Sequence, residues 1–113
     1  AMQKLTEERH IDLTILILPT KGEIYRWIFE GRDPQPDDSR ASGFAEAILA
    51  ACLSKGLMCQ DLKPYLMTEA KRLYKTEGKL LWWRDDSHLG KHGHAAIAWY
   101  IARCLHASST SCQ

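Results

Sequence analysis

The sequence lacks the features that mark several large classes of protein. No apolar run approaches the ~20 residues of a membrane-spanning helix, and the run at residues 13–18 has the length of a β-strand. It has no long basic run and a formal net charge of +1, so we expect no nucleic-acid partner. Its start lacks the charged, apolar and small-residue succession of a signal peptide, so none is expected.

Closely spaced cysteine pairs of the C-x-x-C type are also missing. The four cysteines are Cys52, Cys59, Cys104 and Cys112. Cys52 and Cys104 fall on apolar helical patterns, where a free cysteine behaves as a small hydrophobe. We therefore expect buried or unpaired thiols rather than a disulfide framework. Thiols of that kind favour a reducing, cytoplasmic compartment.

The length and composition are those of one globular domain. With 113 residues, 45% hydrophobic and 26% charged, the chain can build one core and is too short for two. We expect a single α/β domain over residues 1–113, frayed at residues 1–10 and 106–113. The patterns predict strands at residues 12–18, 57–59 and 79–83, and helices at residues 23–29, 43–55, 62–76 and 91–105.

Three of these helices carry apolar residues at helical spacing, which predicts their packed faces. For the helix over 62–76 they are Leu62, Leu66, Ala70 and Leu73. For the helix over 43–55 they are Phe44, Ala47, Ile48, Ala51 and Cys52. For the helix over 91–105 they are Ala95, Ala98, Trp99, Ala102 and Leu105.

Alternating strands and helices predict a three-layer α/β fold, in which helices flank a short parallel sheet with flavodoxin-like winding. The run at 12–18 is apolar on both faces, as is typical of a central parallel strand. Three strands make a thin sheet, so we expect a partial domain or a subunit that completes itself by association. A homo-oligomer would also cover the unpaired strand edges.

Residues 80–94 are the stretch most suggestive of chemistry. An apolar run ends there at Asp85, Asp86 and His88, and glycines and an amphipathic helix follow. In an extended segment, the side chains of Asp86 and His88 point the same way. A carboxylate can fix the tautomer of an imidazole whose other nitrogen takes a proton from a serine. Asp86 and His88 are thus candidates for two members of such a relay, and the alternative is a solvated loop with a capping aspartate.

Three blocks share their order and spacing with one known family. The first is Pro-x-Lys-x-x-x-Tyr, which contains Lys21 and Tyr25, and the second is Asp-Leu-x-Pro at residues 61–64. The third is Asp-Ser-His-Leu at residues 86–89, with a glycine five positions after the histidine and an alanine-rich helix beyond it. Over residues 11–105 the chain therefore resembles the alginate O-acetyltransferase family, SGNH-hydrolase-like proteins that acetylate exopolysaccharide.

The resemblance implies an acyl-transfer or ester-hydrolysis domain of the cell envelope, with no cofactor and a carbohydrate or acyl-ester substrate. Asp86 would be the triad acid and His88 the base. Lys21 and Tyr25 of the first block would support the site. Apart from the resemblance, Trp83 is a candidate for stacking on a sugar ring, with core packing as the alternative, and Asp85 is a candidate for raising the proton affinity of Asp86 by charge repulsion, with a solvated neighbour as the alternative. Leu89 replaces the family's tryptophan. The family's nucleophilic serine belongs to a later block that this sequence does not contain, so we expect a domain that is incomplete or inactive alone.

Two other interpretations stay open. Zinc accepts imidazole and carboxylate ligands, so Asp86, His88, His92 and His94 form an alternative metal set. The chain would otherwise be a non-enzymatic α/β interaction module that oligomerises or binds a partner.

Aromatic residues leave a further choice open. Tyr25, Trp27 and Phe29 either form an exposed patch beside the loop at 31–42 or close the core. Trp82 and Trp83 alternate in direction on the expected strand, so one of them belongs to the core.

Overall fold

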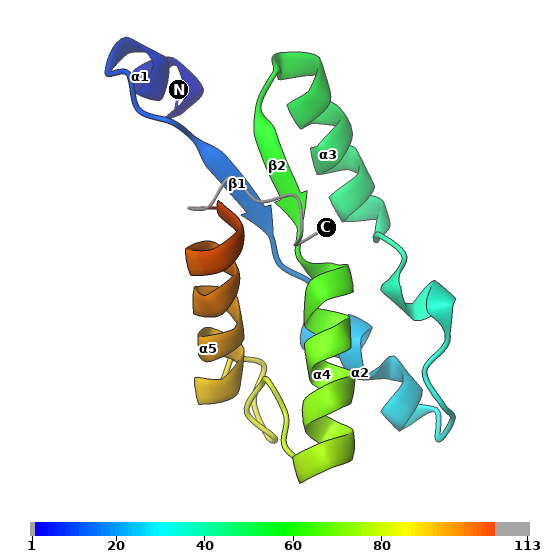
Figure 1. Cartoon of the computed structure of the whole chain (residues 1–113). Coiled ribbons are helices and arrows are strands. Elements are labelled where there is room, and N and C mark those ends of the chain that lie inside the picture. Colours follow the sequence, from blue (N-terminus) through cyan, green and yellow to red (C-terminus); the bar gives the residue numbers. More distant parts are fainter. Residues whose placement is uncertain (1, 106–113) are drawn as a thin grey trace.

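The architecture comes from a computed structural model that describes residues 2–105 (Figure 1). Fraying is expected at both ends of the chain. The C-terminal end, residues 106–113, lies outside the described residues, and the N-terminal end, residues 1–10, contains a short helix. The elements in chain order are α1 (Met2–Glu8), β1 (Thr14–Ile17), α2 (Lys21–Phe29), the 3-10 turn η1 (Pro36–Ser39), α3 (Gly43–Lys55), β2 (Met58–Asp61), α4 (Lys63–Glu77), α5 (Lys91–Tyr100) and the π-helical turn η2 (Ile101–Leu105).

The fold is α/β, with a two-stranded parallel sheet. β1 pairs with β2 from Thr14 opposite Met58 to Ile17 opposite Asp61. Parallel strands need a long crossover connection, and α2, η1 and α3 supply it. In Figure 1, α3 lies alongside β2, and α4 runs on from the end of β2. Leu62 is the N-cap of α4, and the Asp61 side chain just before it accepts the backbone N–H of Lys63 at 3.0 Å.

The third strand predicted at residues 79–83 is wrong. Residues 81–90 form a closed loop instead, in which Trp82 and Leu89 make an isolated antiparallel bridge. The N–H of Gly90 donates to the carbonyl of Leu81 at 2.9 Å, and that of Trp83 donates to the carbonyl of His88 at 3.0 Å. These bonds within the loop satisfy part of its backbone, and the Lys21 and Tyr25 side chains supply further partners, so the segment needs no strand partner.

The main core is built by helices rather than by the sheet. α4 and its N-cap residue contribute the predicted packed face, and Leu62, Leu66, Ala70 and Leu73 are all buried. The other members come from α2, the 81–82 segment, α5 and η2; they include Ile24, Tyr25, Trp27, Leu81, Trp82, Ala96 and Tyr100. Burying this much apolar surface between α2, α4 and α5 is the main stabilising term of the fold.

The packed face predicted for α5 is wrong, and that predicted for α3 is wrong except at Cys52, which is buried. α3 buries Ala45 and Cys52, whereas Phe44 is 71% exposed and Leu53 is 84% exposed. Its sequence is apolar all round, so periodicity does not select one face. α5 buries Gly93, Ala96 and Tyr100 rather than the stripe around Trp99. No described helix is both long enough and apolar enough to cross a membrane.

The expected unpaired thiols are also corrected by the structure. Cys52 and Cys59 form a disulfide across a sequence separation of 7, with Cα atoms 6.2 Å apart. The left-handed turn at Gly56 ends α3 and returns the chain into β2 beside the last helical turn. None of the described cysteines is a free thiol. Closing a loop of this size removes unfolded-state entropy worth about 2 kcal/mol.

Gly93 allows α5 to approach the 81–90 loop closely. A Cβ at this position would lie 2.3 Å from the carbonyl oxygen of Leu81 and 2.6 Å from a methyl group of Leu89. Real Cβ atoms do not tolerate such distances, and the first of these contacts is to backbone that cannot rotate away. The close packing of α5 against the loop therefore explains why a glycine stands at position 93, five residues after His88.

Gly93→Ala should lower the free energy of unfolding by about 2–3 kcal/mol, because α5 or the loop must shift to admit the methyl group. Urea denaturation measures this loss. Gly43→Ala is the matched control, since a Cβ there meets nothing within 4 Å and alanine favours the helix. Equal stabilities of the two variants would contradict the packing argument.

Candidate functional site

Asp86 and His88 lie in contact at the tip of the 81–90 loop. Oδ1 of Asp86 is 2.5 Å from Nδ1 of His88 and also accepts the backbone N–H of His88 at 2.9 Å. This arrangement is a local turn closed by an aspartate rather than two neighbours on a strand. Hydrogen bonds from the His88 side chain and backbone N–H hold the pKa of the Asp86 carboxyl below its ordinary value.

The imidazole of His88 faces solvent beside a small apolar hollow. Its side chain is 81% exposed, against 51% for Asp86. The hollow has a volume of about 270 Å³ and is lined by Leu18, Pro19, Leu66, Trp82, Ser87, His88, Leu89 and Ile97. With Nδ1 facing Asp86, the other ring nitrogen, Nε2, is the one available to a reacting group.

Lys21 holds the backbone of the loop that carries these two residues. Its ammonium group donates to the carbonyl oxygens of Trp83 at 2.6 Å, Arg84 at 2.7 Å and Asp86 at 3.0 Å. An ammonium has three donors, and this one uses each of them on the same loop. Charge-assisted hydrogen bonds are stronger than neutral ones, so Lys21 fixes the path of the backbone into Asp86.

Tyr25 holds the entry to the same loop, one helical turn further along α2. Its hydroxyl accepts the backbone N–H of Leu81 at 2.8 Å, and the side chain is 1% exposed. Burial raises the pKa of the Tyr25 hydroxyl. Tyr25 lies four residues after Lys21, at a kink in α2 where its own backbone is not helical. The two side chains together hold the 81–86 segment at both ends.

The start of α2 is fixed by a capping box. The Thr20 hydroxyl accepts the N–H of Glu23, and the Glu23 carboxylate accepts the N–H of Thr20 at 2.7 Å. Glu23 also pairs with the largely buried Lys63 of α4 at 3.3 Å. Burial acts to raise the pKa of the Glu23 carboxyl, but the hydrogen bonds from Thr20 and Lys63 outweigh it and lower the pKa. Lys21 is thereby anchored in position relative to the core.

The residues proposed to bind substrate or support the site do not line the hollow at His88. Lys21, Tyr25, Trp83 and Asp85 line a separate cleft of about 800 Å³. The two lining sets share Trp82 alone. The acid–histidine pair therefore does not lie in the larger of the two cavities. We identify it as the candidate site from its hydrogen-bond geometry.

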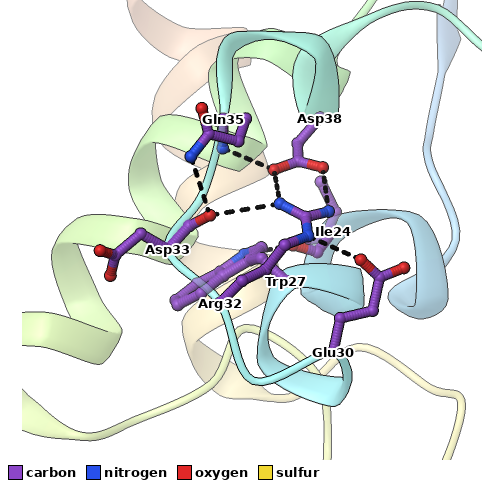
Figure 2. A network of polar contacts seen from close by, with 7 residues as sticks. All are labelled: Ile24, Trp27, Glu30, Arg32, Asp33, Gln35 and Asp38. Carbon is purple, nitrogen blue, oxygen red and sulfur yellow. Dashed lines mark hydrogen bonds and ion pairs between the residues drawn. The ribbon is translucent and has the colours of Figure 1, made fainter.

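The loop at 31–42 is ordered by an ion-pair network that the sequence analysis did not identify (Figure 2). The guanidinium of Arg32 donates two hydrogen bonds to Asp38, at 2.8 and 2.9 Å, and one to Glu30 at 2.6 Å. The paired Arg32 guanidinium lowers the pKa of Asp38, and Asp38 with Glu30 raises the pKa of Arg32. The sequence shows that arginine and acidic residues are present in this loop, but it does not show which of them form ion pairs.

The alternative metal set does not come together. Within residues 2–105, no group of three or more histidine, cysteine, aspartate or glutamate side chains is placed to hold a metal ion. His92 lines the larger cleft, whereas His88 lines the small hollow.

The aromatic residues of α2 divide between the core and the surface. Tyr25 and Trp27 are buried and Phe29 is 74% exposed. The expectation that one of Trp82 and Trp83 belongs to the core is confirmed, because Trp82 is buried and Trp83 is 58% exposed.

Comparisons with known proteins add no relative. The sequence matches no family model, and no curated protein or solved structure matches it significantly.

Lys21→Met should loosen the 81–90 loop, because three backbone carbonyls lose their charged donor. We expect the opening free energy of the Trp83 and Gly90 amides to fall by about 1–3 kcal/mol, as measured by native-state hydrogen exchange. Lys75→Met removes an exposed lysine of α4 and is the control. Unchanged protection in Lys21→Met would show that the loop holds itself.

His88→Ala should raise the pKa of the Asp86 carboxyl toward its ordinary value, because the side-chain donor is lost. An NMR titration of the Asp86 carboxyl carbon measures this shift. Since the folded-state pKa is lowered, the pair stabilises the fold above the unfolded pKa, and this contribution disappears as the pH falls through the folded value. His94→Ala should leave the titration unchanged, and an equal shift in both variants would argue against the Asp86–His88 contact.

Proposed function

We propose that this chain is the acid–base part of an SGNH-like acyl-transfer or ester-hydrolysis domain, of the carbohydrate O-acetyltransferase or acetylesterase type. The observation that carries the proposal is the contact between Asp86 and His88, held in place by Lys21. Lys21 belongs to the first block of the resemblance and Asp86 to the third, and the two residues are 65 positions apart in the sequence. The hydrogen bond from Lys21 to the Asp86 carbonyl brings the two blocks together at one loop. The proposal includes the finer architecture, a three-layer domain with flavodoxin-like winding.

In this mechanism Asp86 stays ionised and accepts a hydrogen bond from Nδ1–H of His88. The carboxylate fixes the tautomer and stabilises the imidazolium that forms when Nε2 takes a proton. That proton comes from a hydroxyl nucleophile, which attacks the acyl carbonyl. The ester C–O bond then breaks, and Nε2–H gives the proton to the leaving alkoxide. Among residues 2–105, the His88 ring is hydrogen-bonded to Asp86 and to no hydroxyl group.

The Cys52–Cys59 disulfide bears on the compartment. Disulfides persist in oxidising surroundings and are rare where thiol reductants are abundant. The bond supports a place in the cell envelope or periplasm over the cytoplasmic alternative.

The activity test uses nitrophenyl acetate, an activated ester that a general base can hydrolyse through water without an enzyme nucleophile. We expect slow turnover above buffer that falls at least roughly tenfold in both Asp86→Ala and His88→Ala. His94→Ala changes an exposed histidine outside the pair and should retain the rate. Turnover that is absent, or equal in all four proteins, would reject the acid–base assignment.

A second candidate function, an interaction module that forms homo-oligomers, is favoured by a different observation. β1 and β2 pair only with each other among the described residues, so each has an unpaired edge. Beside them, α3 exposes Phe44 and Leu53. Sedimentation of the wild type and of the double variant Phe44→Glu with Leu53→Glu tests this second function. A wild-type dimer that dissociates in the double variant supports the interaction module. Monomers of both proteins argue against it.

A further inference from the structure

The larger cleft gathers positive charge from three separate segments. It has a volume of about 800 Å³ and lies against α2, residues 78–85 and the first turn of α5. Its charged lining residues are Lys21, Lys79, Arg84, Asp85 and Lys91. Four cations therefore face one carboxylate, an excess that the net charge of the chain, +1, does not suggest. A concave surface of one sign concentrates counter-ions.

Most of this charge is not neutralised by neighbouring side chains. Within residues 2–105, Arg84 and Lys91 form no salt bridge. Lys79 pairs only with Glu77, at 3.4 Å with both side chains about half exposed, and such a surface pair contributes little. Lys21 is bound to neutral carbonyls, so its charge also remains. The cleft is therefore able to attract an anion.

Two aromatic rings open onto the same cleft. Phe29 is 74% exposed and Trp83 is 58% exposed, and both belong to its lining. Trp83 lies next to Arg84 in the sequence, and Phe29 is at the end of α2. Exposed aromatic side chains beside cations are the usual means of holding a flat ring that carries an anionic group, because the ring stacks while the cations bind the charge.

We propose that this cleft binds a phosphate monoester joined to a flat ring, a ligand of the nucleoside monophosphate kind. A phosphate monoester carries nearly two negative charges at neutral pH and so matches the excess of cations better than a single carboxylate does. Arg84 and Lys91 bind the phosphate, and Trp83 stacks on the ring. The site is separate from the proposed acid–base pair, since neither Asp86 nor His88 lines the cleft.

Isothermal titration calorimetry of the whole chain with adenosine monophosphate tests this site at low ionic strength. We expect saturable binding that is at least roughly tenfold tighter than that of adenosine or of inorganic phosphate alone. Arg84→Gln with Lys91→Gln should weaken it at least roughly tenfold, and added salt should weaken it as well. The control, Lys4→Gln with Lys75→Gln, removes the same net charge from exposed positions outside the cleft and should retain the affinity.

Three outcomes would overturn the proposal: no saturable binding up to about 10 mM nucleotide, inorganic phosphate binding as tightly as the nucleotide, or equal weakening by both double substitutions. The unmodified protein gives a second readout by NMR. The indole N–H of Trp83 should shift on titration while that of the buried Trp27 does not. Because no step measures turnover, failure of this site leaves the acid–base proposal untouched, and the reverse also holds.

Discussion

The hydrogen bonds from the Lys21 ammonium to three backbone carbonyls are the interaction on which the candidate site depends. Carbonyl oxygens that converge in a tight loop repel one another and have no strand partner to satisfy them. A cation at their centre removes both penalties, and it does so with a group that begins a helix of the core. The loop is thereby held where Asp86 and His88 meet, although both side chains are largely in solvent.

The position of the Lys21 ammonium is determined by the first turn of α2. The Thr20–Glu23 capping box sets the start of α2, and Tyr25 lies four residues after Lys21, at the kink in this helix. α2 is in turn packed against α4 through the buried residues Ile24 and Trp27. The Pro-x-Lys-x-x-x-Tyr block therefore has a structural explanation: it supports the loop of the third block from a rigid element, as a site of defined geometry requires.

The sequence predicts those parts of the fold that depend on neighbouring residues alone, such as helix ends and a clear apolar stripe. The bounds of α3 follow from the Ser42 cap and the left-handed Gly56, and the packed face of α4 follows from its clear stripe. The strand predicted at 79–83 is wrong because its backbone finds partners within the 81–90 loop and on the Lys21 and Tyr25 side chains, which no period-two pattern reveals. The buried face of α3 was not predicted because it depends on how α3 packs against β2. The Cys52–Cys59 disulfide depends on the turn at Gly56, which returns the chain beside α3, and the Arg32–Asp38 pair depends on the path of the 31–42 loop.

The central claim is that Lys21 is bound to the loop, and NMR of its side-chain nitrogen tests this most directly. An ammonium group that donates to three carbonyls exchanges its protons slowly and couples across the hydrogen bonds to the carbonyl carbons of Trp83, Arg84 and Asp86. The account predicts that Lys21 gives such a signal while the exposed Lys4 and Lys75 do not. A Lys21 ammonium that exchanges as fast as theirs would contradict it.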